Sequence, residues 1–190
     1  MKKHLLAAVI AATALSLFTT SQAADGFHGV LGTSVTGGGK TLVKVQYQDG
    51  HTQNIRSGGL VHLFGGAEYE SEQFAFQANI GYHVDDTNAR DGSVRFSRWP
   101  VEFIGFFKPQ DNIRLGVGVR KATSAKVATS GAAAYLSSQS FESKAGVILQ
   151  GEYLFAPHWS GLLRFVREDY SLGGTTVQGN HVGLGVSYRF

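Results

Sequence analysis

The stretch VGLGVSYRF, residues 182–190, decides the fold. Read in steps of two, it places five apolar side chains on one side: Val182, Leu184, Val186, Tyr188 and Phe190. Small or polar residues occupy the alternate positions. Because successive side chains of an extended chain point to opposite sides, the pattern predicts a strand with one apolar face, ending on an aromatic ring.

Seven further segments alternate in the same way, most clearly QFAFQANIGYHV at residues 73–84. The others cover residues 27–36, 58–70, 94–107, 113–124, 141–155 and 160–170, and the terminal strand begins at residue 177. Most are longer than the usual globular strand of about 5–6 residues and match the roughly 9–11 tilted residues that cross a bilayer. The sequence therefore predicts eight strands.

The connections between these segments alternate in length. Short turns are expected at residues 71–72, 108–112 and 156–159, and long polar loops at 37–57, 85–93, 125–140 and 171–176. Short turns at one end and long loops at the other are typical of outer-membrane barrels. Within the first long loop, Asp49-Gly50 predicts a small hairpin over residues 41–56, because this dipeptide suits a type I′ turn.

The N-terminus is predicted to be a cleaved secretory signal over residues 1–23. Lys2 and Lys3 precede an apolar run from Leu5 to Phe18, which is shorter than the roughly 20 residues of a membrane-spanning helix, and Ala23 suits the cleavage site. Removal of this segment leaves 15 Lys and Arg against 14 Asp and Glu, so no nucleic-acid partner is expected. The chain has no cysteine, which excludes disulfides and thiolate metal sites.

The two faces of the strands are predicted to be inverted relative to a soluble sandwich, with apolar residues outside and polar residues in the lumen. Aromatic residues near the strand ends support this, because such rings sit at headgroup level. The expected belt at the short turns is Phe27, Tyr69, Phe107, Phe155, Trp159, Tyr188 and Phe190, and the belt at the loops is Tyr82, Phe96, Trp99, Phe141 and Tyr170.

A polar network is expected inside the lumen, built from Glu68, Glu102, Arg120, Lys144, Glu152, Arg164, Glu168 and Arg189. Counting from the turns places Glu152 directly opposite Arg164 and Glu102 diagonal to Arg120. Charges removed from water need partners, and an eight-stranded barrel is just wide enough for its own side chains. Structural filling of the lumen is therefore the expected role of these residues.

The terminal alternation of Val182 to Phe190 resembles the C-terminal insertion signal of bacterial outer-membrane β-barrels, which the barrel-assembly machinery recognises. The layout of residues 24–190 is similar to the small OmpA/OmpX-type barrels. The resemblance implies an all-β fold, an eight-stranded antiparallel up-and-down transmembrane β-barrel in the bacterial outer membrane. It also implies a monomer that meets outer-membrane lipids and lipopolysaccharide, and an extracellular partner reached through the loops.

Three functions remain open on the sequence: a structural or interaction barrel with a plugged lumen, an outer-leaflet lipid-modifying enzyme, and a narrow conduit for small or hydrophobic solutes. The first is preferred. His83, Asp85, Asp86 and Ser93 resemble the ingredients of a palmitoyltransferase-type rim site, but the expected N-terminal amphipathic helix is missing. Residues 168–172 lack the His-x-Ser-Asn signature of the lipid A deacylases.

The conduit would need space in the lumen, which the many inward glycines could leave, although glycines also relieve crowding in a narrow barrel. No catalytic residue and no cofactor is assigned. No metal site is assigned either, because the histidines lack ligand spacing.

Overall fold

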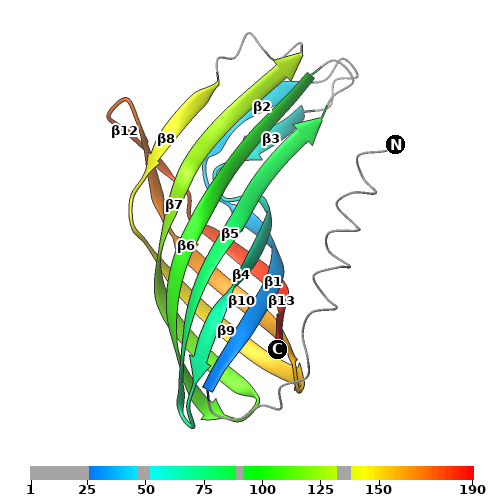
Figure 1. Ribbon diagram of the computed structural model, residues 1–190. Coiled ribbons are helices and arrows are strands. Elements are labelled where there is room, and N and C mark those ends of the chain that lie inside the picture. Colours follow the sequence, from blue (N-terminus) through cyan, green and yellow to red (C-terminus); the bar gives the residue numbers. More distant parts are fainter. Residues whose placement is uncertain (1–25, 47–51, 89–91, 132–137) are drawn as a thin grey trace.

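The computed structural model describes residues 26–46, 52–88, 92–131 and 138–190. Eight antiparallel strands close into a barrel (Figure 1). They are β1 (Gly26–Gly38), β4 (Leu60–Glu70), β5 (Phe74–Asn88), β6 (Gly92–Gln110), β7 (Ile113–Gly131), β9 (Gly146–Ala156), β10 (Trp159–Arg167) and β13 (His181–Arg189). Over the described residues, no helix is long and apolar enough to cross a membrane.

Barrel closure joins the two ends of the described chain. β1 pairs with β13 from Val30 opposite Arg189 to Gly38 opposite His181. The backbones of Gly29 and Phe190 add two further hydrogen bonds, with N···O distances of 2.8 and 3.0 Å. The terminal strand therefore has a partner on each side, β1 and β10, and no edge of the barrel is left unpaired at this strand.

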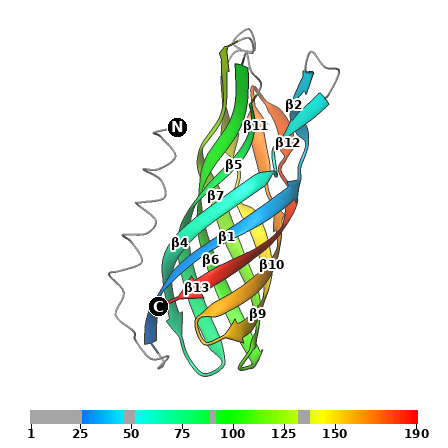
Figure 2. The same cartoon turned by 90° about the vertical axis from the view of Figure 1, so that its right-hand side faces the viewer.

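Five shorter strands build an extension at the long-loop end of the barrel. They are β2 (Thr41–Gln46), β3 (Thr52–Arg56), β8 (Gln139–Ser143), β11 (Asp169–Leu172) and β12 (Thr175–Gln178). β8, β11 and β12 continue the sheet from the protruding part of β7, whereas β2 and β3 form a separate hairpin (Figures 1 and 2). The hairpin predicted over residues 41–56 is confirmed, and its expected Asp49-Gly50 turn lies outside the described residues.

Three of the predicted strands are divided in two. The segments 141–155, 160–170 and 177–190 become β8 and β9, β10 and β11, and β12 and β13. Each break occurs where the chain leaves its barrel neighbour, since β11 pairs with β8 and β12 above the barrel. The loops predicted at 85–93, 125–140 and 171–176 are correspondingly wrong in extent, because strands cover most of the described residues there.

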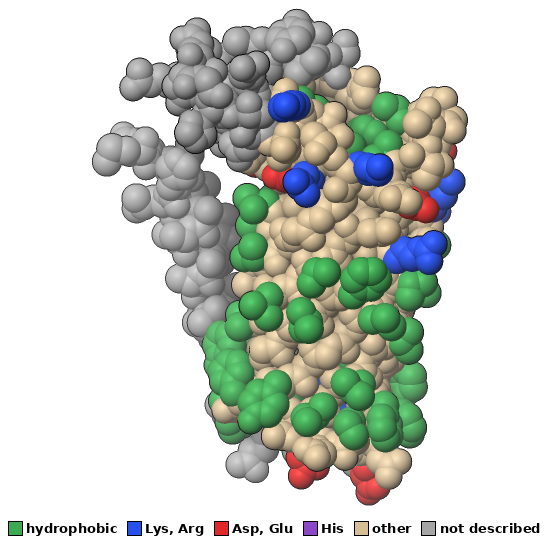
Figure 3. Space-filling model, turned by 180° about the vertical axis from the view of Figure 1, so that it is seen from behind, with side chains coloured by type: hydrophobic (Ala, Val, Ile, Leu, Met, Phe, Trp, Pro, Cys, Tyr) green, Lys and Arg blue, Asp and Glu red, His purple; other side chains and the backbone are tan. Residues whose placement is uncertain are grey.

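The outer wall is apolar and the inner wall is largely polar, as predicted. Leu184 on β13 is 69% exposed and Phe76 on β5 is 63% exposed, whereas Arg120 and Glu102 are at most 1% exposed. A band of hydrophobic side chains covers the lower part of the outer wall (Figure 3). The five apolar residues of the terminal stretch lie on this outer side and are exposed or half-buried.

The aromatic belts need one correction. Trp99 and Tyr82 lie together on the outer wall near the long-loop end, with ring centroids 5.0 Å apart. Phe96 and Tyr170 are expected in that belt, yet both are completely buried. They share the inward alternation of Arg98 and Glu168, respectively, and their rings contact each other at 5.6 Å inside the extension. Phe141 is also expected in the belt, but it packs half-buried against Phe96, with ring centroids 5.7 Å apart.

Candidate functional site

The lumen contains a cluster of charges near the short-turn end, here called the lower cluster: Glu68, Arg114, Glu152 and Arg189. Arg114 lies 2.6 Å from Glu68 and 3.4 Å from Glu152, measured between nitrogen and oxygen. Arg189 lies 3.8 Å from Glu68. The guanidinium of Arg114 also stacks 4.7 Å from the ring centroid of Phe106. All four charged side chains are buried, so they bind one another and fill the lumen near the short-turn end.

A second set of charges, the upper cluster, consists of Arg98, Glu102, Arg120, Arg164 and Glu168. Glu102 accepts from Arg164 at 3.0 Å and lies 3.2 Å from Arg120. Arg120 also reaches Glu168 at 3.1 Å and thereby joins the two carboxylates. Arg98 lies 3.8 Å from Glu168. The five residues come from strands β6, β7 and β10 and the residue that follows β10, so they span the lumen.

Three histidines lie beside the upper cluster. The ring of His83 is 5.2 Å from that of His62 and 5.0 Å from that of His181. Arg98 lies 2.8 Å from Nδ1 of His83, and Thr36 lies 2.8 Å from Nε2. The same Arg98 nitrogen lies 3.2 Å from Nε2, so the guanidinium faces both ring nitrogens of His83. Among the described residues, no group of three or more His, Asp or Glu is placed to hold a metal ion.

Apolar side chains fill the remaining width of the lumen. One cluster is made of Ala75, Ile104, Phe106, Ile148 and Val166, and another of Val30, Phe64 and Leu162. The inward glycines leave room for these rings, because a Cβ at Gly32 would overlap Phe64 and a Cβ at Gly116 would overlap Phe106. In these two cases the glycines relieve crowding and leave no open path.

The β2–β3 hairpin is joined to the barrel mouth by hydrogen bonds to backbone groups. The Ser57 hydroxyl donates to the carbonyl of Gln178 at 2.7 Å and accepts from the Lys40 N–H at 2.9 Å. The Gly39 N–H donates to the Asn180 carbonyl at 2.6 Å. Ile55 is completely buried against residues of the extension, including Val94 and Phe96. The hairpin is therefore a packed cap.

Two carboxylates lie where the cap meets β5, beyond the Tyr82 ring. Asp85 accepts from the Arg56 N–H at 2.8 Å, and burial raises the pKa of Asp85 although this hydrogen bond opposes the shift. Asp86 points to the other face, where it accepts from Arg95 at 2.8 Å, a hydrogen bond that raises the pKa of Arg95. The two neighbouring carboxylates therefore bind different partners on opposite faces of β5.

Seven of the eight residues predicted for the lumen network are buried there, and Lys144 is not. Its side chain is exposed, with Nζ 3.4 Å from the Thr176 hydroxyl, so the prediction for Lys144 is wrong. The cause is the break between β8, which ends at Ser143, and β9, which begins at Gly146.

Both predicted pairings within the network are also wrong. Gln150, and not Glu152, lies opposite Arg164. The turn pairs Trp159 with Ala156, one residue away from the expected register, and a shift between Trp159 and Ser160 moves the pairing by one residue more. Glu102 lies directly opposite Arg120, because the turn is shorter than the expected 108–112, with Gln110 paired with Ile113, and a one-residue shift follows before Phe107 pairs with Leu115.

Four buried side chains in or beside the two charge clusters are missing from the predicted network: Arg98, Arg114, His62 and His83. The alternation of residues along the strands already indicates that these side chains face the lumen. Arg98 shares the inward side of β6 with Glu102, and Arg114 shares the inward side of β7 with Arg120. The same parity places His62 with Glu68.

The residues considered for an enzyme are not brought together. His83 and Asp85 face inward with the partners described above, and Asp86 faces Arg95. The Ser93 hydroxyl pairs with that of Ser130 at 2.8 Å. No nucleophile, base and carboxylate converge among these four residues as nucleophilic catalysis requires.

Basic side chains gather on the outer wall above the hydrophobic band. Lys121 on β7, Lys144 between β8 and β9, and Arg167 on β10 are all exposed. Register places them together, because Val119 on β7 and Arg167 on β10 both lie opposite Val147 of β9. None of the three forms an ion pair within the described part of the chain. Figure 3 shows Lys and Arg side chains directly above the green band.

Comparison with known proteins agrees with this architecture. The model of the outer membrane protein beta-barrel domain matches residues 10–190. The attachment invasion locus protein Ail of Yersinia pestis has a similar structure, with 15% sequence identity over 88% of this chain and 100% of its own, and a TM-score of 0.53. Neisserial surface protein A is 16% identical over 87% of this chain and 97% of its own, also with a TM-score of 0.53. No curated protein sequence matches significantly.

Proposed function

The chain belongs to the outer membrane protein β-barrel family, and from this premise we propose that it is a closed, non-conducting barrel of structural and interaction type. It lies in the bacterial outer membrane, with its short turns in the periplasm and its extension outside. We further propose that it acts as a monomer through its outer wall and its extension, where loops and edge strands are available to an extracellular partner.

The observation that carries this proposal is the filled lumen. Two clusters of buried charges pack against two apolar clusters within the lumen, with Arg114 over the Phe106 ring and Arg164 over the Phe64 ring, and the packed cap lies above them. Each buried charge in these clusters lies against an opposite charge, and opening a water-filled path would separate the pairs.

Planar-bilayer recording tests the closed lumen. We expect no unit conductance from the purified, folded barrel. An outer-membrane porin reconstituted in the same way serves as the positive control. Reproducible single-channel steps from the wild-type protein would overturn the proposal and favour the narrow conduit instead.

We propose a non-enzymatic role because the polar candidates at the rim have separate structural partners. Mass spectra of lipid A and phospholipids from cells with and without the protein test this point. An acyl chain that is added or missing only when the protein is present would contradict it.

Lipopolysaccharide is the proposed lipid partner of the outer wall. Lys121, Lys144 and Arg167 lie at the outer edge of the hydrophobic band, at the level where lipid A phosphates would be found. A basic residue near an anionic lipid surface contributes about 1 kcal/mol. Three residues therefore predict roughly a hundredfold effect on affinity.

The test compares two triple variants with equal changes in charge. Lys121→Ala/Lys144→Ala/Arg167→Ala should bind purified lipopolysaccharide roughly a hundredfold more weakly than the wild type. Lys40→Ala/Lys44→Ala/Arg56→Ala, which alters exposed residues in and beside the cap, should bind as the wild type does. Equal losses in both variants would show a nonspecific charge effect and contradict the site.

A further inference from the structure

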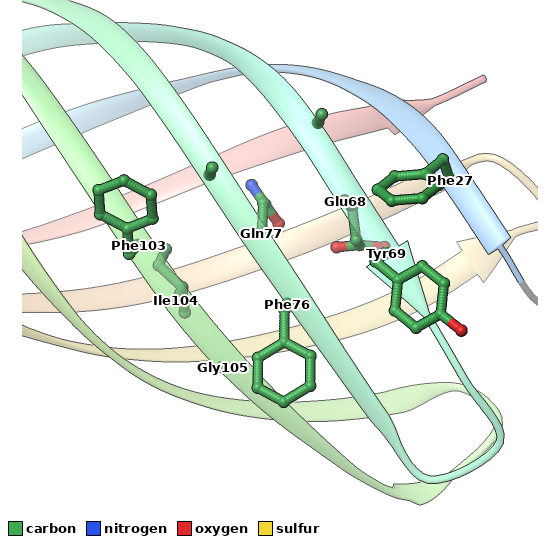
Figure 4. A pocket seen from close by; sticks show the side chains of 10 residues that line it. Phe27, Glu68, Tyr69, Phe76, Gln77, Phe103, Ile104 and Gly105 are labelled. Carbon is green, nitrogen blue, oxygen red and sulfur yellow. The ribbon is translucent and has the colours of Figure 1, made fainter.

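A groove crosses the outer wall of the barrel near its periplasmic end. Its floor is formed by the small residues Ala67 on β4, Ala78 on β5 and Gly105 on β6, and its volume is about 440 Å³. Four aromatic rings rise around it: Phe27, Tyr69, Phe76 and Phe103. Figure 4 shows these rings directed away from the barrel, whereas Glu68 and Gln77 point to the inner side.

Strand register explains why the small residues gather. Ala67 lies opposite Ala78, Ala78 lies opposite Phe103, and Gly105 lies opposite Phe76. Three neighbouring strands therefore carry a small outward residue in the same region, between positions that carry large rings. A Cβ at Gly105 would have only ordinary contacts, the nearest being 3.7 Å from the Phe76 ring, so the space above it is open.

The rings form the walls of the groove. Phe27 and Tyr69 contact each other with centroids 5.1 Å apart and lie at the periplasmic end. Phe103 and Phe76 are 59% and 63% exposed and stand on β6 and β5. Adjacent strands lie about 4.8 Å apart, so a groove from β1 to β6 is roughly 14 Å long. Because barrel strands tilt, this direction runs obliquely between the headgroup level and the middle of the membrane.

We propose that this groove binds one acyl chain of a glycerophospholipid from the periplasmic leaflet. The hydrophobic band around it is the lipid-contacting surface of the barrel. The polar atoms of Glu68 and Gln77 are turned into the lumen, so the groove is lined mainly by apolar atoms, with the Tyr69 hydroxyl at its periplasmic end. A peptide backbone would leave its polar groups unsatisfied there, whereas an acyl chain has none.

The charges nearest the groove do not take part in it. Glu70 and Lys108 share the inward alternation of Glu68 and Phe106, and their charged groups lie 2.6 Å apart. They therefore bind each other on the lumen side, so recognition by the groove rests on the acyl chain alone.

Native mass spectrometry tests the site with added palmitoyl-oleoyl-phosphatidylethanolamine as the probe. The wild-type barrel, released from a mild detergent, should retain one phospholipid. Gly105→Leu should reduce the retained fraction at least tenfold, because its side chain fills the groove. Ala78→Leu is the second filling variant and should have the same effect.

Gly151→Leu is the matched control, since Gly151 faces outward on β9 outside the groove and a Cβ there meets nothing within 4 Å. It should retain lipid as the wild type does, and heat-modifiable migration verifies folding of each variant. Retention by both filling variants at the wild-type level would overturn the proposal. Equal loss in the Gly151→Leu control, or a lipid-free dimer whose contact depends on Gly105, would also overturn it.

Discussion

Arg114 on β7 contacts Glu68 on β4 across the lumen, with 2.6 Å between Nη2 and Oε2. The two strands are not neighbours in the sheet, so this ion pair ties opposite parts of the wall. Breaking a buried pair by removing one partner leaves an uncompensated charge, which costs about 3–5 kcal/mol. We expect Glu68→Gln to lower the free energy of unfolding by this amount in urea titrations of the barrel in phospholipid vesicles.

The control for this prediction is Glu72→Gln in the exposed turn, which should unfold as the wild type does. The double variant Glu68→Gln/Arg114→Gln should lose less stability than the two single variants together, because the interaction between Arg114 and Glu68 is lost in each single variant but is counted only once in the double variant. Additive losses would contradict a direct coupling between Arg114 and Glu68.

Attachment of the cap depends on Ser57, whose hydroxyl joins the hairpin to Gln178 and Lys40. Removing it leaves buried backbone groups without this partner, at a cost of about 1–3 kcal/mol. Ser57→Ala should therefore open the hairpin more often and speed trypsin cleavage after Lys44 or Arg56 roughly tenfold. Ser71→Ala removes a hydroxyl from the exposed turn and should leave the cleavage rate unchanged. Cleavage of Ser57→Ala at the wild-type rate would refute this role.

Stability should fall in acid partly through Glu70, which lies beyond the Tyr69 ring at the periplasmic rim. Burial alone would raise the pKa of Glu70, but the hydrogen bond and charge of Lys108 hold it below 4.5. A carboxylate with a lowered folded-state pKa stabilises the protein above its unfolded pKa and loses this effect as pH falls through the folded value. Melting temperatures measured between pH 7 and pH 3 should therefore depend less steeply on pH in Glu70→Gln than in the wild type. Parallel curves would contradict the prediction.

Phe190 has two separable roles at the end of the chain. Its backbone pairs with Gly29 and continues the closing ladder, and its ring covers Gly29. Deletion of Phe190 removes both contributions and should strongly reduce the heat-modifiable, folded fraction in the outer membrane. Phe190→Ala keeps the backbone bonds, so a reduction in this variant reports on the aromatic ring, through its contact with Gly29 or its recognition by the assembly machinery. Wild-type yield from both variants would mean that the terminal pattern is not an insertion signal.

The face of the barrel wall on which each side chain lies could be predicted from the sequence, because it depends only on alternation along each strand. Alternation alone assigns Leu184 to the outside and Glu102 to the inside, and the same parity would have assigned Arg98, Phe96 and Tyr170 correctly. The error at Phe96 and Tyr170 came from expecting every ring near a strand end to face lipid. Inside the extension these rings form an apolar core of their own.

Contacts between distant strands could not be predicted in this way. The pairing of Arg114 with Glu68 depends on how the closed wall staggers its strands, and the bond from Ser57 to Gln178 joins residues 121 positions apart. The direct partner of Arg164 depends on one register shift beside Trp159. Lys144 continues the inward alternation of its segment, so nothing in its immediate sequence reveals the strand break that exposes it.

The long ladder between β6 and β7 also determines how the molecule would bear mechanical load. The two strands stay paired from Gln110 and Ile113 near the periplasm to Gly92 and Gly131 outside, with two register shifts on the way. A pull on the extension along these strands would be resisted in shear, by many hydrogen bonds loaded at once. The short pairing of β11 with β12 would instead separate bond by bond when pulled sideways. A tether attached through β6 or β7 would thus transmit force directly into the membrane-embedded wall, and one attached through β12 would yield first.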